Sequence, residues 1–548
     1  MRTDPVAELN KAWRRHASVV RRLHEKIFYR PLLDAVAQLA PGESRLSARA
    51  AAIRLEALGY ADPAAALRHL EALSSGVSRK AAIQRTLLPV LLGWFADSAD
   101  PDAGLLGFRK VSDALGKTPW YLRLLRDEGA AAENLARVLS AGRLAPDLLM
   151  RAPEAVAIRG RPGGLTPAPG STWSRRCWLR WGVRTARSRR SRWCAGCAAG
   201  AVPYGGRRHH RLVRYGGQPG RAGPRGPRRP RRLRRHRPHA ATIAGALRAA
   251  VRERWGDTLP TRFAVIGMGR FGGHELSYGS DADVLFVHRP REGVSDEEAG
   301  KAANAVVGEM RRLLQLPTAD PPLLIDADLR PEGRTGPMVR TLKSYEAYYR
   351  RWSLVWESQA LLRAEHMAGD AELGAEFIEL VNPLRYPAEG LGEDAVREIR
   401  RLKARMESER MPRGADPTLH AKLGRGGLSD VEWTVQLLQM QHGWAEPGLR
   451  TTRTREALAA ACAAELIPAE DAEMLDEAWV LATRVRNAVM LVRGRPGDTF
   501  PSDPRELAAV GRYLGYEPGH VGDMLDDYRR ITRRARAVVE ERFYGAVV

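Results

Sequence analysis

The chain has 548 residues, only four cysteines and a formal net charge of +24. This length allows several domains whose cores need no disulfide bonds, and so few cysteines favour a reducing compartment. No stretch is apolar over the roughly 20 residues that a membrane helix needs, and residues 1–5 show no signal-peptide pattern. We therefore expect a cytoplasmic protein without membrane association, and exclude a disulfide-rich secreted protein.

Residues 1–157 are predicted to be helical. Between Pro63 and Ser75, apolar side chains recur at helical spacing behind a proline that suits a first helical turn. Similar patterns follow in residues 79–96 and 112–128, and helix pairs joined by short polar turns predict a bundle. No catalytic set of side chains occurs in this region, so we expect a scaffold.

One segment holds almost all of the net positive charge. Residues 159–237 contain 23 arginines and no Asp, Glu or Lys, so the rest of the chain has a net charge of only +1. A G+C-rich gene read one nucleotide out of frame yields this mixture of Arg, Gly, Pro, Ala, Trp and Cys, and we predict that residues 158–240 are such a frame-shifted segment. The alternatives are a disordered basic linker, or a metal or nucleic-acid module. Cys194 and Cys197 have zinc-site spacing but no second pair follows, and we expect no nucleic-acid partner.

Residues 241–388 are predicted to form an α+β domain with a mixed sheet. The pattern places strands at residues 263–266, 283–288 and 323–328, and a helix at residues 299–315. Two phosphate-handling motifs compete within this domain. Gly267, Gly269 and Gly272 match the dinucleotide fingerprint G-x-G-x-x-G, which would indicate an oxidoreductase. That interpretation is disfavoured, because the chain breaks again at Gly279 before a crossover helix has room to form.

The second motif, G-S-D-x-D, indicates nucleotidyl transfer. Asp281 and Asp283 are expected on one face of a strand, about 7 Å apart. Together with Asp326 on a later strand, they would hold one or two Mg²⁺ ions for displacement at phosphorus. Asp328 is predicted to share the strand face of Asp326.

Other residues of this domain are candidates for binding the triphosphate of ATP. We expect backbone N–H groups and one hydroxyl to approach it at four positions, Gly272, Gly273, Gly279 and Ser280. Arg330, and after it Arg340 and Lys343, are the candidate cations.

Residues 389–548 again show a helical period and predict a C-terminal bundle. Ser429 and Glu432 have the spacing of a capping box at the start of one helix. The preceding G-R-G-G leaves two interpretations open. Either Arg425 and nearby N–H groups face a phosphate or a target protein, or the glycines only form a tight turn.

Three stretches together closely resemble glutamine synthetase adenylyltransferases: residues 267–286, 326–364 and 422–444. The resemblance covers residues 261–548 and implies a polymerase-β-like nucleotidyltransferase domain followed by a helical bundle. Members of this family carry two such modules, transfer AMP from ATP to a tyrosine of glutamine synthetase and remove it by phosphorolysis. They respond to the signal protein PII and to glutamine.

The resemblance also assigns roles to individual residues. Asp281 and Asp283 match the paired metal ligands, and Asp326 matches the later acid, which is the candidate base for the tyrosine proton. Asp328 stands where the family commonly has arginine, which argues against it as a ligand. The sequence S-Y-G-S-D at residues 277–281 is similar to that of the adenylylating module. The AMP-removing module is expected to be missing. A catalytically silent chain that only binds glutamine synthetase or PII is the alternative.

Overall fold

The computed structural model describes residues 48–116, 118–127, 129–152, 156, 238–316 and 321–545. The frame-shift prediction for residues 158–240 concerns a segment that lies outside the described residues, except for its last three positions. The Cys194–Cys197 pair and residues 1–40 also lie outside them.

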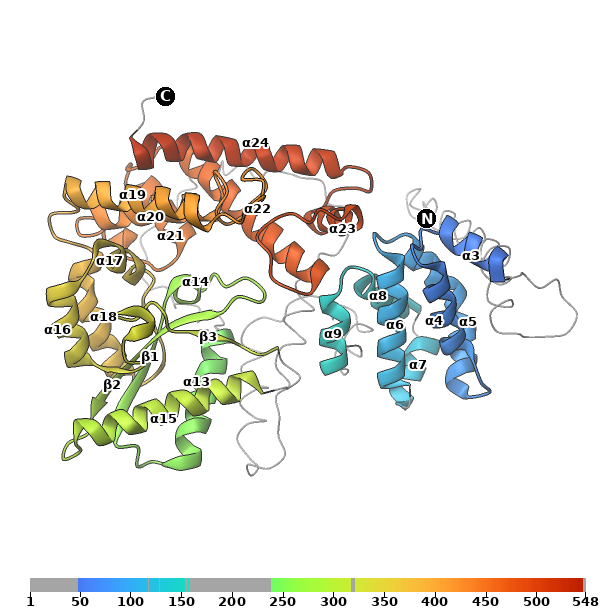
Figure 1. The fold of residues 1–548 in the computed structure, drawn as a ribbon, viewed down its shortest axis with the longest axis horizontal. Coiled ribbons are helices and arrows are strands. Elements are labelled where there is room, and N and C mark those ends of the chain that lie inside the picture. Colours follow the sequence, from blue (N-terminus) through green and yellow to red (C-terminus); the bar gives the residue numbers. More distant parts are fainter. Residues whose placement is uncertain are drawn as a thin grey trace, which may run out of the picture.

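The described residues upstream of the Arg-rich segment are helical, as predicted. They form α3 (Ala48–Ala57), α4 (Pro63–Ser74), α5 (Arg79–Ala96), α6 (Pro101–Leu115), α7 (Pro119–Asp127), α8 (Gly129–Leu139) and α9 (Leu144–Arg151). Asp62 caps α4 directly before Pro63 by accepting a hydrogen bond from the Ala65 N–H. These helices share one apolar core and lie beside the rest of the molecule, where α9 contacts α22 (Figure 1).

A mixed sheet forms the centre of the second part, as predicted. Its strands are β1 (Thr261–Gly267), β2 (Ala282–Pro290), β3 (Ile325–Asp326), β4 (Arg340–Thr341) and β5 (Glu365–Gly369). β1 pairs antiparallel with both β2 and β5, whereas β3 and β4 run parallel to β2. The prediction of a strand over residues 323–328 is wrong in extent. Only two residues form β3, because the chain turns after Asp326.

Helices cover both faces of this sheet (Figure 1). Phe263, Val265 and Phe286 face α13 (Pro238–Arg254) and α15 (Asp296–Gln315). The alternate residues Ile266 and Leu285 face the other layer, which consists of α16 (Leu342–Trp352), α17 (Val355–Leu361) and α18 (Ala371–Arg385). Neighbouring side chains of a strand point to opposite faces of the sheet. Consecutive residues of β1 and β2 are buried, so both faces of these strands are covered.

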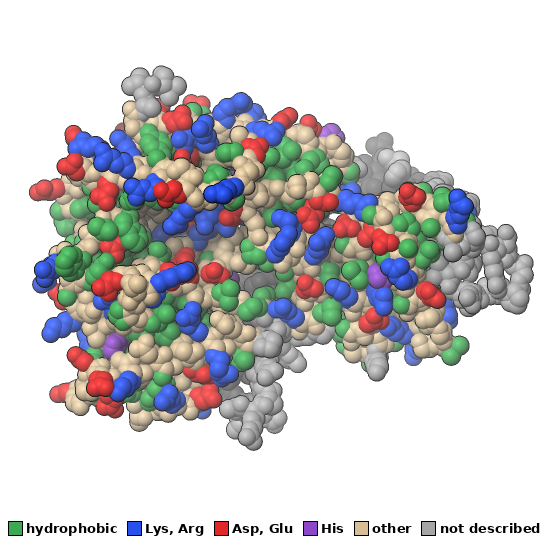
Figure 2. Space-filling view, viewed as in Figure 1, with side chains coloured by type: hydrophobic (Ala, Val, Ile, Leu, Met, Phe, Trp, Pro, Cys, Tyr) green, Lys and Arg blue, Asp and Glu red, His purple; other side chains and the backbone are tan. Residues whose placement is uncertain are grey.

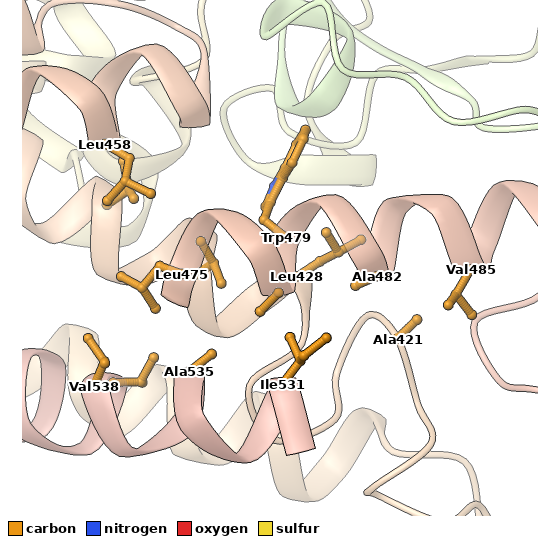
Figure 3. Close-up of a cluster of buried hydrophobic side chains, with 14 of the residues drawn as sticks. Ala421, Leu428, Leu458, Leu475, Trp479, Ala482, Val485, Ile531, Ala535 and Val538 are labelled. Carbon is orange, nitrogen blue, oxygen red and sulfur yellow. The ribbon is translucent and has the colours of Figure 1, made fainter. Parts of the chain in front are cut away.

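The C-terminal helices form the predicted bundle: α19 (Glu393–Arg410), α20 (Leu428–His442), α21 (Thr454–Ala463), α22 (Ala469–Arg493), α23 (Pro504–Leu514) and α24 (Val521–Val539). Figure 3 shows the seam between α22 and α24, where Leu475, Ala482, Ala535 and Val538 are buried. Within the described residues, no helix combines the length and the apolar character that crossing a bilayer requires.

The predicted capping box at α20 is wrong. Gly427 is the N-cap, so Ser429 lies inside the first turn, and its side chain is buried rather than capping the helix. The Glu432 carboxylate instead bonds to Arg270 of the sheet domain. The tertiary contact therefore overrides the local pattern.

Candidate active site

Two carboxylates are brought together where β2 and β3 begin to pair. Asp283 lies directly opposite Asp326 in the parallel register, and the Ala282 N–H donates to the Leu324 carbonyl at 2.8 Å to start the ladder. Adjacent strands are about 4.8 Å apart, so the two acids are neighbours across the sheet. The predicted proximity of Asp283 and Asp326 is therefore present in the structure.

A glycine makes room for the Asp283 carboxylate. Gly269 has φ +49°, in the left-handed region, and a Cβ at this position would collide with Asp283 Oδ2. The Met268 N–H also donates to the Asp283 carbonyl at 2.8 Å. The G-x-G turn and the carboxylate motif are thus parts of one site rather than competing sites.

The dinucleotide interpretation conflicts with this geometry. β1 and β2 pair antiparallel, whereas a dinucleotide-binding unit needs two parallel strands joined by a crossover helix. The helix that follows the glycine turn, α14 (Gly269–Gly272), has only four residues.

Asp281 lies beside the pair but not on the strand, contrary to prediction. β2 begins at Ala282, so Asp281 is an exposed residue directly before it. Among the described residues, no three His, Cys, Asp or Glu side chains converge as a ready set of metal ligands. The assignment of all three acids to one metal site therefore stays a prediction.

The site holds an excess of negative charge around Asp283. The pKa of Asp283 is raised to about 6, mainly by burial and also by the negative charges of Asp326 and Asp281, while the positive charge of Lys422 lowers it. Carboxylates crowded in this way are stabilised by a cation. Magnesium fits such a donor set, since it is commonly held by one or two carboxylates together with phosphate oxygens of the substrate.

Asp328 and Arg330 belong to the turn that follows β3. Asp328 pairs with Arg334 at 2.6 Å, and its N–H donates to Asp326 Oδ1 at 2.7 Å. The predicted common strand face for Asp326 and Asp328 is therefore wrong. The buried Arg330 guanidinium donates to the carbonyls of Ala327, Gly336 and Arg334, which favours a role in holding this turn over phosphate binding.

The predicted approach of the Gly272 and Gly273 N–H groups to a phosphate conflicts with their bonds. They donate to the carbonyls of Met268 and Gly269, respectively. A Cβ on Gly272 would collide with the Arg363 carbonyl, so this glycine permits close packing within the protein.

Gly279 and Ser280 form the turn before Asp281. Gly279 has φ +70° and is exposed, which suits a close approach of backbone to a ligand. A Cβ at Gly279 would come within 2.9 Å of Met490 Cε. The turn therefore rests on helix α22, and the predicted contact of Gly279 and Ser280 with the triphosphate stays a prediction.

Comparison with known proteins shows the family of the chain. The chain is 74% identical to a bifunctional glutamine synthetase adenylyltransferase/adenylyl-removing enzyme of Streptomyces avermitilis, over 100% of this chain and 55% of that protein. Proteins of the same name from Streptomyces coelicolor and Nocardia farcinica are 72% and 50% identical, over 100% and 99% of this chain and 55% and 54% of theirs. The chain belongs to the glutamine synthetase adenylyltransferase family.

Two family models match separate parts of the chain. A glutamate-ammonia ligase adenylyltransferase model matches residues 240–380, and a GlnD PII-uridylyltransferase model matches residues 398–543. The chain spans about half the length of the curated relatives described above. The matched parts correspond to the sheet domain and to the bundle.

In this family member the bundle holds the glycine turn of the sheet domain. Arg270 donates to Glu432 at 2.9 Å and lies over the Trp479 ring, which points out of the bundle core in Figure 3. Glu275 accepts from Arg363 at 2.8 Å and from the Thr454 N–H at 2.7 Å. The sequence analysis missed these contacts, since each joins residues far apart in the chain.

Proposed function

We propose that this chain transfers AMP from ATP to a tyrosine hydroxyl of glutamine synthetase. The observation that carries the proposal is the pairing of Asp283 with Asp326, beside the glycine turn at Gly269. Paired carboxylates of this kind serve nucleotidyl transfer. The relatives' names give the acceptor, glutamine synthetase.

We also propose a fold for the sheet domain and the boundaries of the domains. The sheet domain is polymerase-β-like and comprises residues 241–388, followed by a bundle at 389–548. Residues 1–157 are a helical region that corresponds to the end of one module and the segment between modules. The support is the mixed sheet and the positions of the two family-model matches.

Asp281, Asp283 and Asp326 would hold Mg²⁺, together with oxygens of the ATP phosphates. The support for this assignment is the register that places Asp283 opposite Asp326, with Asp281 directly before the strand. A bound Mg²⁺ would supply charge stabilisation at the reacting phosphate.

The proposed reaction is a displacement at the α-phosphorus of ATP. The tyrosine oxygen attacks the α-phosphorus, a new P–O bond forms, and the bond between the α-phosphorus and the bridging oxygen breaks so that pyrophosphate leaves with the electron pair. Asp326 accepts or orients the tyrosine proton. One of its oxygens already accepts from the Asp328 N–H, which fixes the orientation of the carboxyl group.

The chain is proposed to act in the adenylylating direction, in the cytoplasm, with PII as a regulatory partner. The small number of cysteines supports the location, PII is what the family resemblance implies, and the resemblance of residues 277–281 to the adenylylating module supports the direction. The turn that they form rests on Met490 of helix α22.

Transfer of label tests the proposed function. The full chain is incubated with glutamine synthetase, Mg²⁺ and ATP labelled at either the α- or the γ-phosphorus. We expect label on the synthetase from α-labelled ATP only. Label from γ-labelled ATP would indicate phosphoryl transfer, and no label from either would favour a chain that only binds its partner.

A further inference from the structure

Lys422 is an exposed cation at the edge of the carboxylate site. It belongs to the bundle, in the loop between α19 and α20, more than 90 residues from Asp326 in the chain. Within the described part of the chain its ammonium group forms no ion pair. Its loop lies beside α22, the helix that also contacts the turn at Gly279 and Ser280 before the carboxylates.

The backbone of Lys422 is held on both sides. Its N–H donates to His420 Nδ1 at 3.3 Å, and its carbonyl accepts from the Ser429 N–H at 3.0 Å. Its neighbour Ala421 is fully buried, and the Ala421 N–H donates to the Asp498 carbonyl at 2.6 Å. Because the backbone is already fixed, only the lysine side chain loses conformational freedom when it binds a ligand.

A buried ionic cluster fixes the G-R-G-G turn that follows. Asp430 is 1% exposed and accepts from Lys403 at 2.5 Å, from Arg536 at 3.0 Å and from the Gly426 N–H at 2.7 Å. Because the Gly426 N–H is already bonded, and the Gly427 N–H donates to the Gly424 carbonyl, these groups are not available to a phosphate. For these N–H groups the structure favours the tight-turn interpretation, while the Arg425 side chain is exposed and its predicted contact with a phosphate or a target protein stays a prediction.

Helix α22 and the segment after it contact both the loop that contains Lys422 and the turn at residues 277–280, which we call the catalytic turn. Arg486 donates to Asp498 Oδ1 at 2.5 Å, on the same residue whose carbonyl holds Ala421. Arg486 also reaches Ser277 Oγ at 3.4 Å, and Asn487 accepts from the Tyr278 N–H at 3.2 Å. Figure 3 shows Ala421 beside α22, next to Val485. The two loops therefore rest on one helix and its C-terminal extension.

Of the three cations predicted to meet the triphosphate, Lys343 is exposed, whereas the two arginines are engaged within the sheet domain. Arg330 is bonded to three backbone carbonyls, and Arg340 is buried and bonded to Glu332 and Ser344. The bundle side of the boundary is rich in Lys and Arg, which Figure 2 shows where the bundle faces the sheet domain. Lys422 is exposed, and its loop is tied through Asp498 and Arg486 to Ser277, four residues before Asp281.

We propose that Lys422 is a nucleotide-binding residue whose ammonium group binds the β- and γ-phosphates of ATP. The proposal rests on the proposed function and adds a second domain to the active site. The sheet domain supplies the carboxylates, and the bundle supplies the cation that balances the charge of the leaving pyrophosphate. A lysine acts here as a point charge on a flexible stem, as in other phosphate sites.

Calorimetric titration of the full chain with ATP and with AMP, both with Mg²⁺, tests this proposal. Lys422→Met should bind ATP about tenfold or more weakly, since charge-assisted hydrogen bonds to phosphate are among the stronger ones. AMP lacks the β- and γ-phosphates, so its affinity should not change. Lys422→Arg should restore most of the ATP affinity. Arg401→Met removes an exposed charge from α19 of the same bundle and should bind ATP like the wild type.

The outcomes separate the inference from the proposed function. If the wild type binds ATP and transfers AMP while Lys422→Met binds ATP equally well, the inference about Lys422 is wrong and the proposed function stands. Equal losses for ATP and AMP would also overturn it, because they would indicate a general disturbance of the site. If the wild type neither binds ATP nor transfers AMP, both are wrong.

Discussion

Arg270 and Glu432, 162 residues apart in the chain, are joined by a 2.9 Å hydrogen bond between the glycine turn of the sheet domain and helix α20 of the bundle. Their side chains are only 13% and 18% exposed. Arg270 also donates to the Glu275 carbonyl at 2.9 Å, so the same guanidinium stabilises the loop leading to Asp281. The orientation of the glycine turn and of the loop that leads to Asp281 therefore depends on the bundle.

Removing one partner of this pair should destabilise the protein strongly. Arg270→Met leaves the Glu432 carboxylate largely buried without its main counter-charge, which typically costs about 3–5 kcal/mol of unfolding free energy. Urea unfolding measures this loss. The double variant with Glu432→Gln should lose less than the sum of the two single variants, and exact additivity would contradict direct coupling.

Gly269→Ala should impair catalysis more than folding. A Cβ at this position collides with Asp283 Oδ2 and requires φ +49° of a residue that avoids it. Displacing a catalytic group by about 1 Å can cost on the order of 10²-fold in rate, which a transfer assay measures. Gly308→Ala in α15 is the matched control, because a Cβ there meets nothing within 4 Å. Wild-type activity of Gly269→Ala would show that the close approach has no catalytic importance.

The stability of the sheet domain should depend on pH through Asp370. The Arg262 guanidinium donates to Asp370 at 2.7 Å and holds the pKa of that carboxyl at about 2, below its usual 3.8. A lowered pKa stabilises the fold above the unfolded value near pH 4, and this stabilisation is lost as the pH falls towards 2.

Arg262→Met should therefore lower the unfolding free energy by about 1–2 kcal/mol near pH 6, allowing for partial exposure of the pair. The difference from the wild type should shrink between pH 4 and pH 2. A difference that stays constant over that range would indicate that the variant acts by lost packing rather than by lost charge.

The chain should not carry the phosphorolytic, AMP-removing activity of its family. Among the described residues, only Asp283 and Asp326 form a pair of carboxylates on neighbouring strands. The described region from α3 to α9 has no strand on which a second pair could lie. We expect no phosphate-dependent release of ADP from adenylylated glutamine synthetase when pyrophosphate is absent. Release that persists in Asp281→Asn would reveal a second active site, and release that disappears in that variant would reverse the assigned direction.

The sequence predicts those parts of the fold and site that depend on local patterns. The short apolar runs at residues 263–266 and 284–287 predict β1 and β2, and the G-S-D-x-D motif points to Asp283, which the structure places opposite Asp326. The helical periods of both flanking regions are also local. Each of these signals is complete within a short window of the chain.

The remaining features depend on contacts between distant segments. Gly269 resembles part of a dinucleotide fingerprint until the antiparallel pairing of β1 with β2 places it against Asp283. Arg330 resembles a phosphate ligand until the turn after β3 wraps backbone carbonyls around it. Lys422 carries no local signal, because its role follows from how the bundle packs on the sheet domain.

The most direct test of the account is the rate of AMP transfer to glutamine synthetase by Asp283→Asn beside that of the wild type. The account predicts a loss on the order of 10³-fold or more, since a metal contact in the transition state is worth several kcal/mol. The thermal unfolding midpoint should not fall, because the substitution removes a partly buried charge that the fold itself does not pair. Retention of more than about a tenth of the wild-type rate would contradict the assignment of Asp283 to the catalytic centre.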